Sequence, residues 1–202
     1  MTAQATDAMV YDGNEYVVID ANRGLLFDPK AFGIDPISLS TACYRGFSCE
    51  YAIERGCLVL NQLEISSGDV DPVTRVLTLY PLPLLNGHAA QTGDLQHASF
   101  AGLYENLQLP LTYSGNILIS RNADNAYPPR FRGCARAWEY DSNLLVTAMD
   151  GQVQKVLDVS DKIATFIARY IEGGIEGDMI DGDQRRNARK FWDRQFGPGF
   201  SM

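Results

Sequence analysis

Residues 43–65 read CYRGFSCEYAIERGCLVLNQLEI, and this stretch decides the fold because two alternating β-forming segments flank the turn Glu54-Arg55-Gly56. A similar stretch lies near the other end of the chain, where residues 137–159 read AWEYDSNLLVTAMDGQVQKVLDV. Its turn, Asp150-Gly151, is one residue shorter, and the two stretches finish alike (NQLEI and KVLDV). The repeat predicts two β-hairpins in a domain of two similar halves, and it does not identify a reaction.

The first of these stretches also indicates which side chains are buried. Every second side chain of a strand points to the same face, and one face of this strand is apolar. Arg45 interrupts that face, so we expect it at the sheet margin or paired with a carboxylate. The apolar members are Cys43, Phe47, Cys49, Tyr51 and Ile53.

Strand patterns separated by turn residues continue through most of the chain and predict a mainly β fold (β-dominated α+β). A tight hairpin is predicted at Asp12-Gly13, and a further strand over 73–80 is ended by Pro81 and Pro83. We expect an antiparallel, sandwich-like domain. Two packed sheets are favoured over a closed barrel, because the strands are short and interrupted by long loops.

One amphipathic helix is predicted within residues 160–172, after the last strand. Ser160 or Asp161 is expected to cap its first turn by accepting a hydrogen bond from the backbone. Apolar side chains recur with helical spacing and form a single stripe that must pack against another element. The stripe comprises Ile163, Phe166, Ile167, Tyr170 and Ile171.

The domain organisation predicted from these patterns has two parts. Residues 1–172 form the β-rich domain with its helix, and residues 173–202 form a linker and a basic, aromatic C-terminal extension. The linker is acidic and rich in glycine, which is typical of a flexible connection. Residues 184–196 are expected to form a short helix.

Composition and charge exclude several classes of function. The four cysteines lack the C-x2-C spacing of zinc sites, so we expect buried, reduced thiols at Cys43, Cys49, Cys57 and Cys134. No secretory signal or membrane-spanning stretch is recognised, which predicts a cytoplasmic protein with no membrane partner. Residues 184–202 carry five cations and one carboxylate (+4), whereas the preceding chain carries 12 cations and 24 carboxylates (−12). An acidic body repels phosphate, so nucleic acid is not an expected partner.

Three phrases of the sequence resemble a set of uncharacterised bacterial β-rich proteins. They are LLFDP at 25–29, STACYRGF at 40–47 and LPLTYSGNILI at 109–119. The resemblance covers about residues 9–160, and it implies a bacterial or phage-related origin. It carries no activity, cofactor or site residue over to this chain.

A search for catalytic and metal-binding patterns identifies no catalytic residue, no metal ligand and no cofactor. His88 and His97 are the only imidazoles, and Cys43 and Cys49 lie on a face predicted to be buried, where an apolar setting raises the thiol pKa. The acidic sequence GDMIDGD at 177–183 does not have the spacing of an EF-hand loop, and a solvated linker is the expected role.

The C-terminal extension is the strongest candidate for an interaction site, because arginine and tryptophan are enriched at interface hot spots. Three roles compete for it: folding back on the acidic body, docking on a protein partner or a second copy, and binding nucleic acid. The candidate interaction residues are Arg185, Arg186, Arg189, Lys190, Trp192, Arg194 and Phe196.

We therefore expect a non-enzymatic protein-binding protein. Two versions are an acidic immunity or inhibitor protein that covers a basic partner and an assembly subunit that self-associates through its extension. The alternative is a small enzyme or ligand-binding protein with a pocket between the sheets, lined by Tyr44, Arg45 and Trp138.

Overall fold

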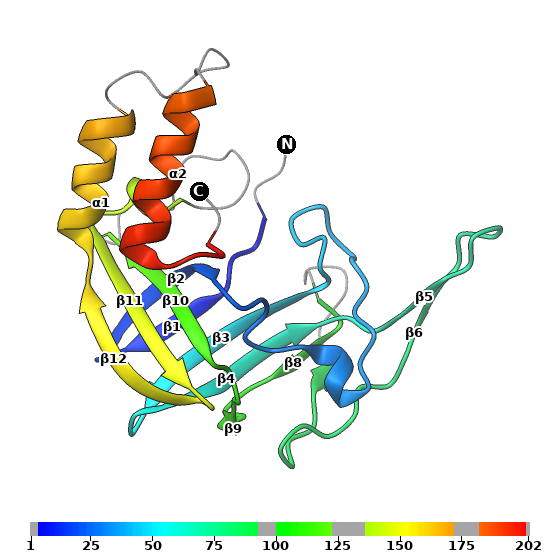
Figure 1. Cartoon of the computed structure of the whole chain (residues 1–202). Helices are drawn as coiled ribbons and strands as arrows, with labels where there is room; N and C mark the ends of the chain where they lie inside the picture. Colours follow the sequence, from blue (N-terminus) through cyan, green and yellow to red (C-terminus); the bar gives the residue numbers. More distant parts are fainter. Residues whose placement is uncertain (1–3, 93–99, 123–135, 172–181, 201–202) are drawn as a thin grey trace.

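The computed structural model describes residues 4–92, 100–122, 136–171 and 182–200, and its main feature is a closed seven-stranded β-barrel (Figure 1). Around the barrel the strands follow the order β12–β11–β10–β2–β1–β3–β4, and β4 meets β12. All neighbours are antiparallel except β1 and β3. The strands are β1 (Ala8–Tyr11), β2 (Asn14–Ala21), β3 (Phe47–Glu54), β4 (Cys57–Ile65), β10 (Gly115–Arg121), β11 (Ser142–Met149) and β12 (Gln152–Asp158).

The two repeated hairpins are confirmed as β3–β4 and β11–β12, and their turns close the barrel. Both turns have two residues with positive φ, Arg55 (50°) and Gly56 (80°) in one and Asp150 (46°) and Gly151 (77°) in the other. This is the type I′ geometry that matches the twist of a hairpin. Glu54 belongs to β3, so the expected difference in turn length is absent.

Closure is reciprocal between the two turns. The amide of Leu58 donates to the carbonyl of Gly151 (2.8 Å), and the amide of Val153 donates to the carbonyl of Gly56 (2.8 Å). Each donor lies two residues after the glycine of its own turn. The two hairpins are therefore related by a local two-fold at the point where they meet.

The prediction of a sandwich is wrong, because the hydrogen-bonded ring encloses one core. Interior side chains such as Met9, Tyr51, Leu60, Ile117 and Val146 belong to a single buried cluster. The long connections that suggested two sheets leave the ring intact. The segment between β2 and β3 returns the chain so that β3 lies parallel to β1.

The helix predicted over 160–172 is observed as α1 (Ser160–Phe166) followed by the π-helix η3 (Ile167–Ile171). The predicted cap is wrong. Val159 occupies the N-cap position without a side-chain hydrogen bond, and the Ser160 hydroxyl accepts a hydrogen bond from the amide of Asn143 in β11 (2.9 Å). The hydroxyl thus joins the helix to the barrel.

A second apolar cluster lies outside the barrel, between its wall and the helices. Strand residues Leu118 and Leu145 pack there against Ile163 and Phe166 of α1. The second helix, α2 (Gly182–Phe196), and the 3-10 turn η2 (Ala137–Glu139) complete the cluster. The boundary predicted after residue 172 borders residues outside the described ranges, and α2 beyond it shares this core with the barrel.

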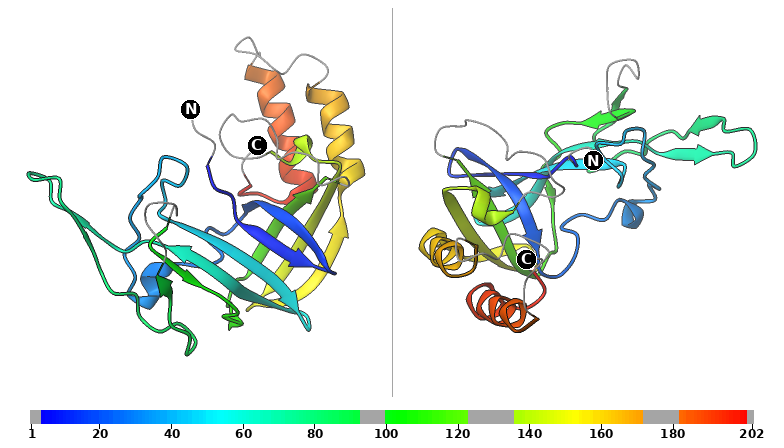
Figure 2. Two further views of the ribbon diagram at one scale, coloured as in Figure 1. Left: turned by 180° about the vertical axis from the view of Figure 1, so that it is seen from behind. Right: turned by 90° about the horizontal axis from the view of Figure 1, so that it is seen from above.

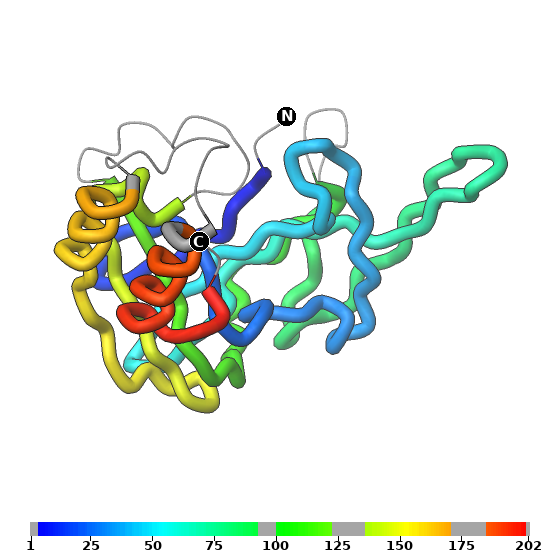
Figure 3. The backbone as a smooth tube through the Cα atoms, turned by 45° about the horizontal axis from the view of Figure 1, so that its top comes forward, coloured from blue at the N-terminus to red at the C-terminus, as the bar shows by residue number. Residues whose placement is uncertain are grey.

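The remaining elements extend the sheet away from the helices (Figure 2). Strand β8 (Gly102–Tyr104) pairs with β4, and β7 (Gln91–Thr92) pairs with β8. Strand β9 (Leu109–Pro110) pairs with another part of β4. The segment η1 (Pro29–Phe32) is a 3-10 turn. A separate two-stranded sheet, β5 (Gly68–Val70) with β6 (Leu77–Leu79), projects from the body (Figures 1 and 3). We call residues 68–79 the arm. Among the described residues, no helix is both long and apolar enough to cross a bilayer.

Candidate functional site: the projecting arm

Exposed apolar side chains concentrate on the arm and its root. Within the described residues, ten large apolar side chains are exposed, and six of them lie in the short stretch 70–84. Val73 at the tip is 87% exposed. A concentration of exposed apolar side chains marks a site of interaction more often than a scattered exposed leucine does. The six are Val70, Val73, Val76, Leu77, Tyr80 and Leu84.

The tip of the arm is an ordered turn organised by Asp71. Its carboxylate accepts hydrogen bonds from the amides of Val73 (2.8 Å) and Thr74 (2.7 Å). These bonds favour the charged carboxylate and lower the pKa of Asp71 below its ordinary value. The turn therefore presents Val73 to solvent in a defined position.

The root of the arm is anchored to the body by backbone contacts. Tyr80 donates its amide to Ser67 (2.9 Å), and Ile37 donates to Ser66 (2.9 Å). Gly68 permits the close approach of the two strands, because a Cβ atom there would lie 2.3 Å from the carbonyl oxygen of Thr78. These contacts fix the direction in which the arm leaves the barrel.

A two-stranded hairpin is marginally stable in water when it has no apolar face packed on another element. Strands β5 and β6 pair with each other along residues 68–79, and within the described residues neither has a second strand partner. Their outer edges therefore offer backbone hydrogen-bonding groups for strand addition. The arm thus combines open strand edges with exposed apolar side chains.

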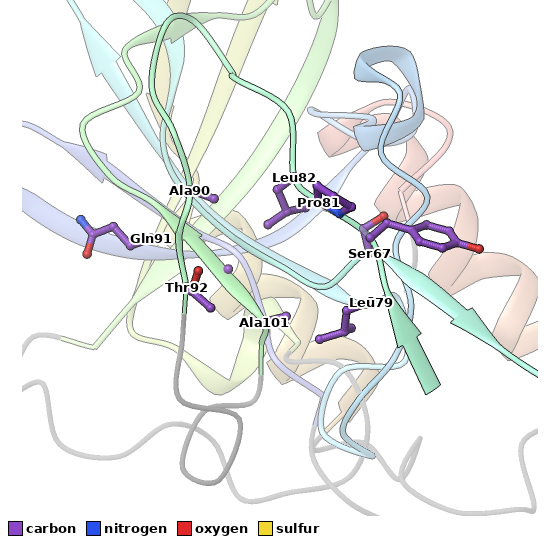
Figure 4. A pocket seen from close by; sticks show the side chains of 10 residues that line it. Ser67, Leu79, Pro81, Leu82, Ala90, Gln91, Thr92 and Ala101 are labelled. Carbon is purple, nitrogen blue, oxygen red and sulfur yellow. The ribbon is translucent and has the colours of Figure 1, made fainter. Parts of the chain in front are cut away.

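A pocket of about 290 Å³ lies at the root of the arm, where it meets β7 and β8. Leu79 and Leu82 lie on one side of it, and Ala90 and Thr92 lie on the other (Figure 4). Its volume is at the lower limit of small-molecule sites, so it suits one or two apolar side chains better than a bulky cofactor. The complete lining is Ser67, Leu79, Tyr80, Pro81, Leu82, Ala90, Gln91, Thr92, Ala101 and Gly102.

The predicted interaction residues of the extension are divided between surface and core. Trp192 and Phe196 are buried in the second apolar cluster, where the Trp192 ring lies 4.5 Å from Phe196 and 4.9 Å from Phe166 between centroids. The extension thus folds back on its own body, one of the three expected roles. A role for its cations in binding a partner stays a prediction. Arg185, Arg186, Lys190 and Arg194 are exposed, and half-buried Arg189 pairs with Asp193 (2.8 Å).

Arg45, one residue of the alternative pocket, is engaged in a structural ion pair. Its guanidinium binds the carboxylate of Asp7 through both terminal nitrogens and donates Nε–H to the carbonyl of Phe47 (2.7 Å). Burial disfavours the charge, but the hydrogen bonds and attraction to Asp7 outweigh it and raise the pKa of Arg45. The expectation that Arg45 pairs with a carboxylate is confirmed.

The other residues considered for the alternative pocket or for catalysis are dispersed. Tyr44 is 69% exposed, whereas Trp138 packs on Phe166 and Trp192, so neither lines the pocket at the arm root. Burial raises the pKa of the Cys49 thiol, as expected for a buried strand residue. His88 is exposed in a tight turn.

His97, Cys134 and most of the acidic 177–183 sequence lie outside the described residues. Across the described ranges, no three His, Cys, Asp or Glu side chains come close enough to hold a metal ion. Cys43 and Cys49 are free and buried as predicted, and Cys57 is free but only half-buried.

Searches with protein-family models, curated proteins and solved structures found no match to this chain. The resemblance to bacterial β-rich proteins stays an expectation. Function is therefore inferred from the geometry of the arm and its surroundings.

Sequence reasoning predicted a strand over 73–80 but missed the arm. Only Leu77–Leu79 is a strand, and Val73 lies in the turn. A signal was present, because Asp71-Pro72 is a turn sequence and the following VLTLY at 76–80 is apolar and uncharged. An apolar run of this kind ordinarily predicts a buried strand. Nothing in the sequence pattern indicates that these side chains are exposed.

Proposed function

We propose that this protein acts by binding another polypeptide and that the arm is its main contact. One observation carries the proposal: of the ten large apolar side chains exposed in the described part of the chain, four lie on the arm, which projects from the barrel, and two more, Tyr80 and Leu84, follow at its root. A surface of this composition loses unfavourable contact with water when a partner covers it. The anchored root and ordered tip support binding because they present these side chains with little loss of conformational freedom.

The size of the apolar surface is adequate for association. The six side chains expose on the order of 600 Å², which is similar to the largest apolar patch of a typical monomer, and such patches are often functional. The affinity does not follow from this area alone, because association also costs ~4–15 kcal/mol in lost freedom of motion. The arm can thus support a reversible contact.

Between the two versions of a binding protein, the arm favours an assembly subunit. The immunity or inhibitor version draws on the net charge of −8, which would speed capture of a basic partner. The arm carries two carboxylates, Asp69 and Asp71, and one cation, Arg75, so its net charge is −1 and its specificity does not derive from a strong net charge. The exposed cations of α2 lie on the opposite side of the barrel and form a second candidate contact (Figure 2).

The proposal is tested by site-specific photocrosslinking in the native host. A photoreactive amino acid at Val73 is expected to crosslink to a polypeptide, whereas the same group at Leu25, an exposed apolar residue outside the stretch 68–84, is not. A third position, Lys190 on α2, tests the second candidate contact. If Val73 forms no crosslink, or forms no more than Leu25, the arm is not the binding site.

A further inference from the structure

We propose that the polypeptide bound by the arm is a second copy of this chain, with the two arms antiparallel about a two-fold axis. This inference rests on the proposed function, because it identifies the partner of the same surface. The proposed dimer involves two features at opposite ends of the arm. The apolar tip lies at one end of the arm, and the pocket of about 290 Å³ lies at the other.

Charge decides which edge of the arm pairs with its copy. The β5 edge carries Asp69 and Asp71, both exposed, so pairing β5 with another β5 brings like charges together and is unfavourable. The β6 edge runs through VLTLY at 76–80, which has no charged residue and favours β-structure. Two copies therefore join through β6 and form a four-stranded sheet in the order β5–β6–β6–β5.

The two-fold arrangement brings each tip to the pocket of the other copy. In an antiparallel pairing centred on Leu77, the residues before it face the residues after it in the other copy. The β6 strand of one copy therefore runs toward the root of the other, and the turn that carries Val73 lies beside the residues that follow β6 in the partner copy, among them Pro81 and Leu82 of the pocket lining. Because the operation is symmetric, one alignment places both tips at both pockets and satisfies both open β6 edges. If β6 instead pairs with a strand of an unrelated protein, the purified chain stays monomeric.

The expected dimer is weak and strengthened by salt. Pairing through β6 removes at most ~1,200 Å² from water, at the lower limit of specific interfaces, because side chains of the outer β5 strand such as Val70 stay outside the contact. Each copy carries a net charge of −8, so the bodies repel each other at low ionic strength. Salt screens this repulsion and leaves the apolar contact intact. Association driven by the α2 cations and the acidic body would show the opposite dependence on salt.

The test is sedimentation of the purified full chain over about 1–100 µM, which spans the affinities expected for weak interfaces, at about 0.05 M and 0.5 M NaCl. We expect a monomer–dimer equilibrium that tightens at the higher salt. Val73→Asp at the tip and Thr92→Trp at the pocket should each raise the dissociation constant at least about tenfold. Leu25→Asp, an equal change of charge on an exposed apolar residue outside the arm, should leave it unchanged.

Mixing the two variants tests reciprocity directly. A mixed dimer of Val73→Asp with Thr92→Trp retains one intact tip and one intact pocket in contact, whereas each variant alone retains none. The equimolar mixture should therefore dimerise more than either variant by itself. Val73 and Thr92 are exposed, so unchanged thermal unfolding confirms that both variants fold.

Two results would overturn the proposal: a monomer at all concentrations in both salts, or equal weakening by Leu25→Asp. A mixture no stronger than its components would also overturn the tip-to-pocket arrangement. The proposed function fails separately. If position 73 crosslinks to a different polypeptide while the pure chain stays monomeric, the arm binds protein but its partner is not a second copy.

Discussion

At the scale of single residues, Asp71 shapes the arm with one carboxylate. The group is fully exposed, and its two hydrogen bonds to the amides of Val73 and Thr74 lower its pKa. Because the pKa of Asp71 is lower in the folded turn than in the unfolded chain, its carboxylate stabilises the turn at pH values above the unfolded pKa. This contribution is lost as the pH falls through the lowered value.

Acid should therefore open the tip of the arm. We expect the amide resonances of Val73 and Thr74 to move toward random-coil positions as the pH falls below about 4, the ordinary pKa of aspartate. Asp71→Asn keeps a hydrogen-bond acceptor but does not titrate. In this variant the amide resonances of Val73 and Thr74 should therefore show no transition near pH 4. NMR titration of both proteins makes the comparison. A wild-type tip that keeps its shifts down to acid unfolding would contradict this role for Asp71.

At the scale of elements, the two closing turns share a geometry but differ in surroundings. Gly56 and Gly151 have φ near +80°, a region in which other residues are strained. A Cβ atom at Gly56 would meet nothing within 4 Å, whereas one at Gly151 would lie 1.8 Å from the carbonyl oxygen of Leu111. The second turn is packed against the chain, and the first is open to solvent.

The two glycines therefore form a matched pair for substitution. Gly56→Ala should lower the free energy of unfolding by about 1 kcal/mol, through backbone strain alone. Gly151→Ala adds a steric overlap with Leu111, so its loss should reach about 3 kcal/mol or more. Urea denaturation of the three proteins measures the difference. Equal losses would show that packing at Gly151 does not contribute to closure of the barrel.

At the scale of the whole molecule, α2 belongs to the fold and not to an appended tail. Trp192 is 1% exposed and contacts the rings of Phe166, Trp138 and Phe196. The cations of the helix face outward, so one element presents an apolar face to the barrel and a basic face to solvent. Docking α2 on the barrel wall brings the basic segment onto an acidic body.

Removing the anchor of this helix should destabilise the entire protein. Trp192→Ala is expected to lower the free energy of unfolding by about 3–5 kcal/mol, because it empties a fully buried aromatic site. Arg194→Ala, on the exposed face of the same helix, should change it by no more than about 0.5 kcal/mol. Thermal unfolding followed by circular dichroism compares them. A Trp192→Ala protein as stable as wild type would show that α2 is not part of the cooperative unit.

Patterns along the chain predicted the candidate site only in part. The turn at Asp71 and the β-forming run at 76–80 can be recognised in the sequence. An apolar run predicts a buried strand, however, so the exposure of the arm could not be predicted from it. Arginine and tryptophan in the extension indicated an interface. The same residue types also build cores, and Trp192 packs within its own chain.

The sequence by itself determined the hairpins, the helix at Ser160 and the short helix of the extension, because their signals act between residues a few positions apart. Positive φ at the turns and side-chain periodicity are local properties. The tertiary structure alone decided that the sheet closes and that the arm projects from it. Closure depends on contacts such as Gln152 with Cys57, 95 residues apart. No local pattern encodes which distant edges meet, so the sequence of these strands is compatible with a sandwich as well as a barrel, and the hydrogen bonds between the two turns decide for the barrel.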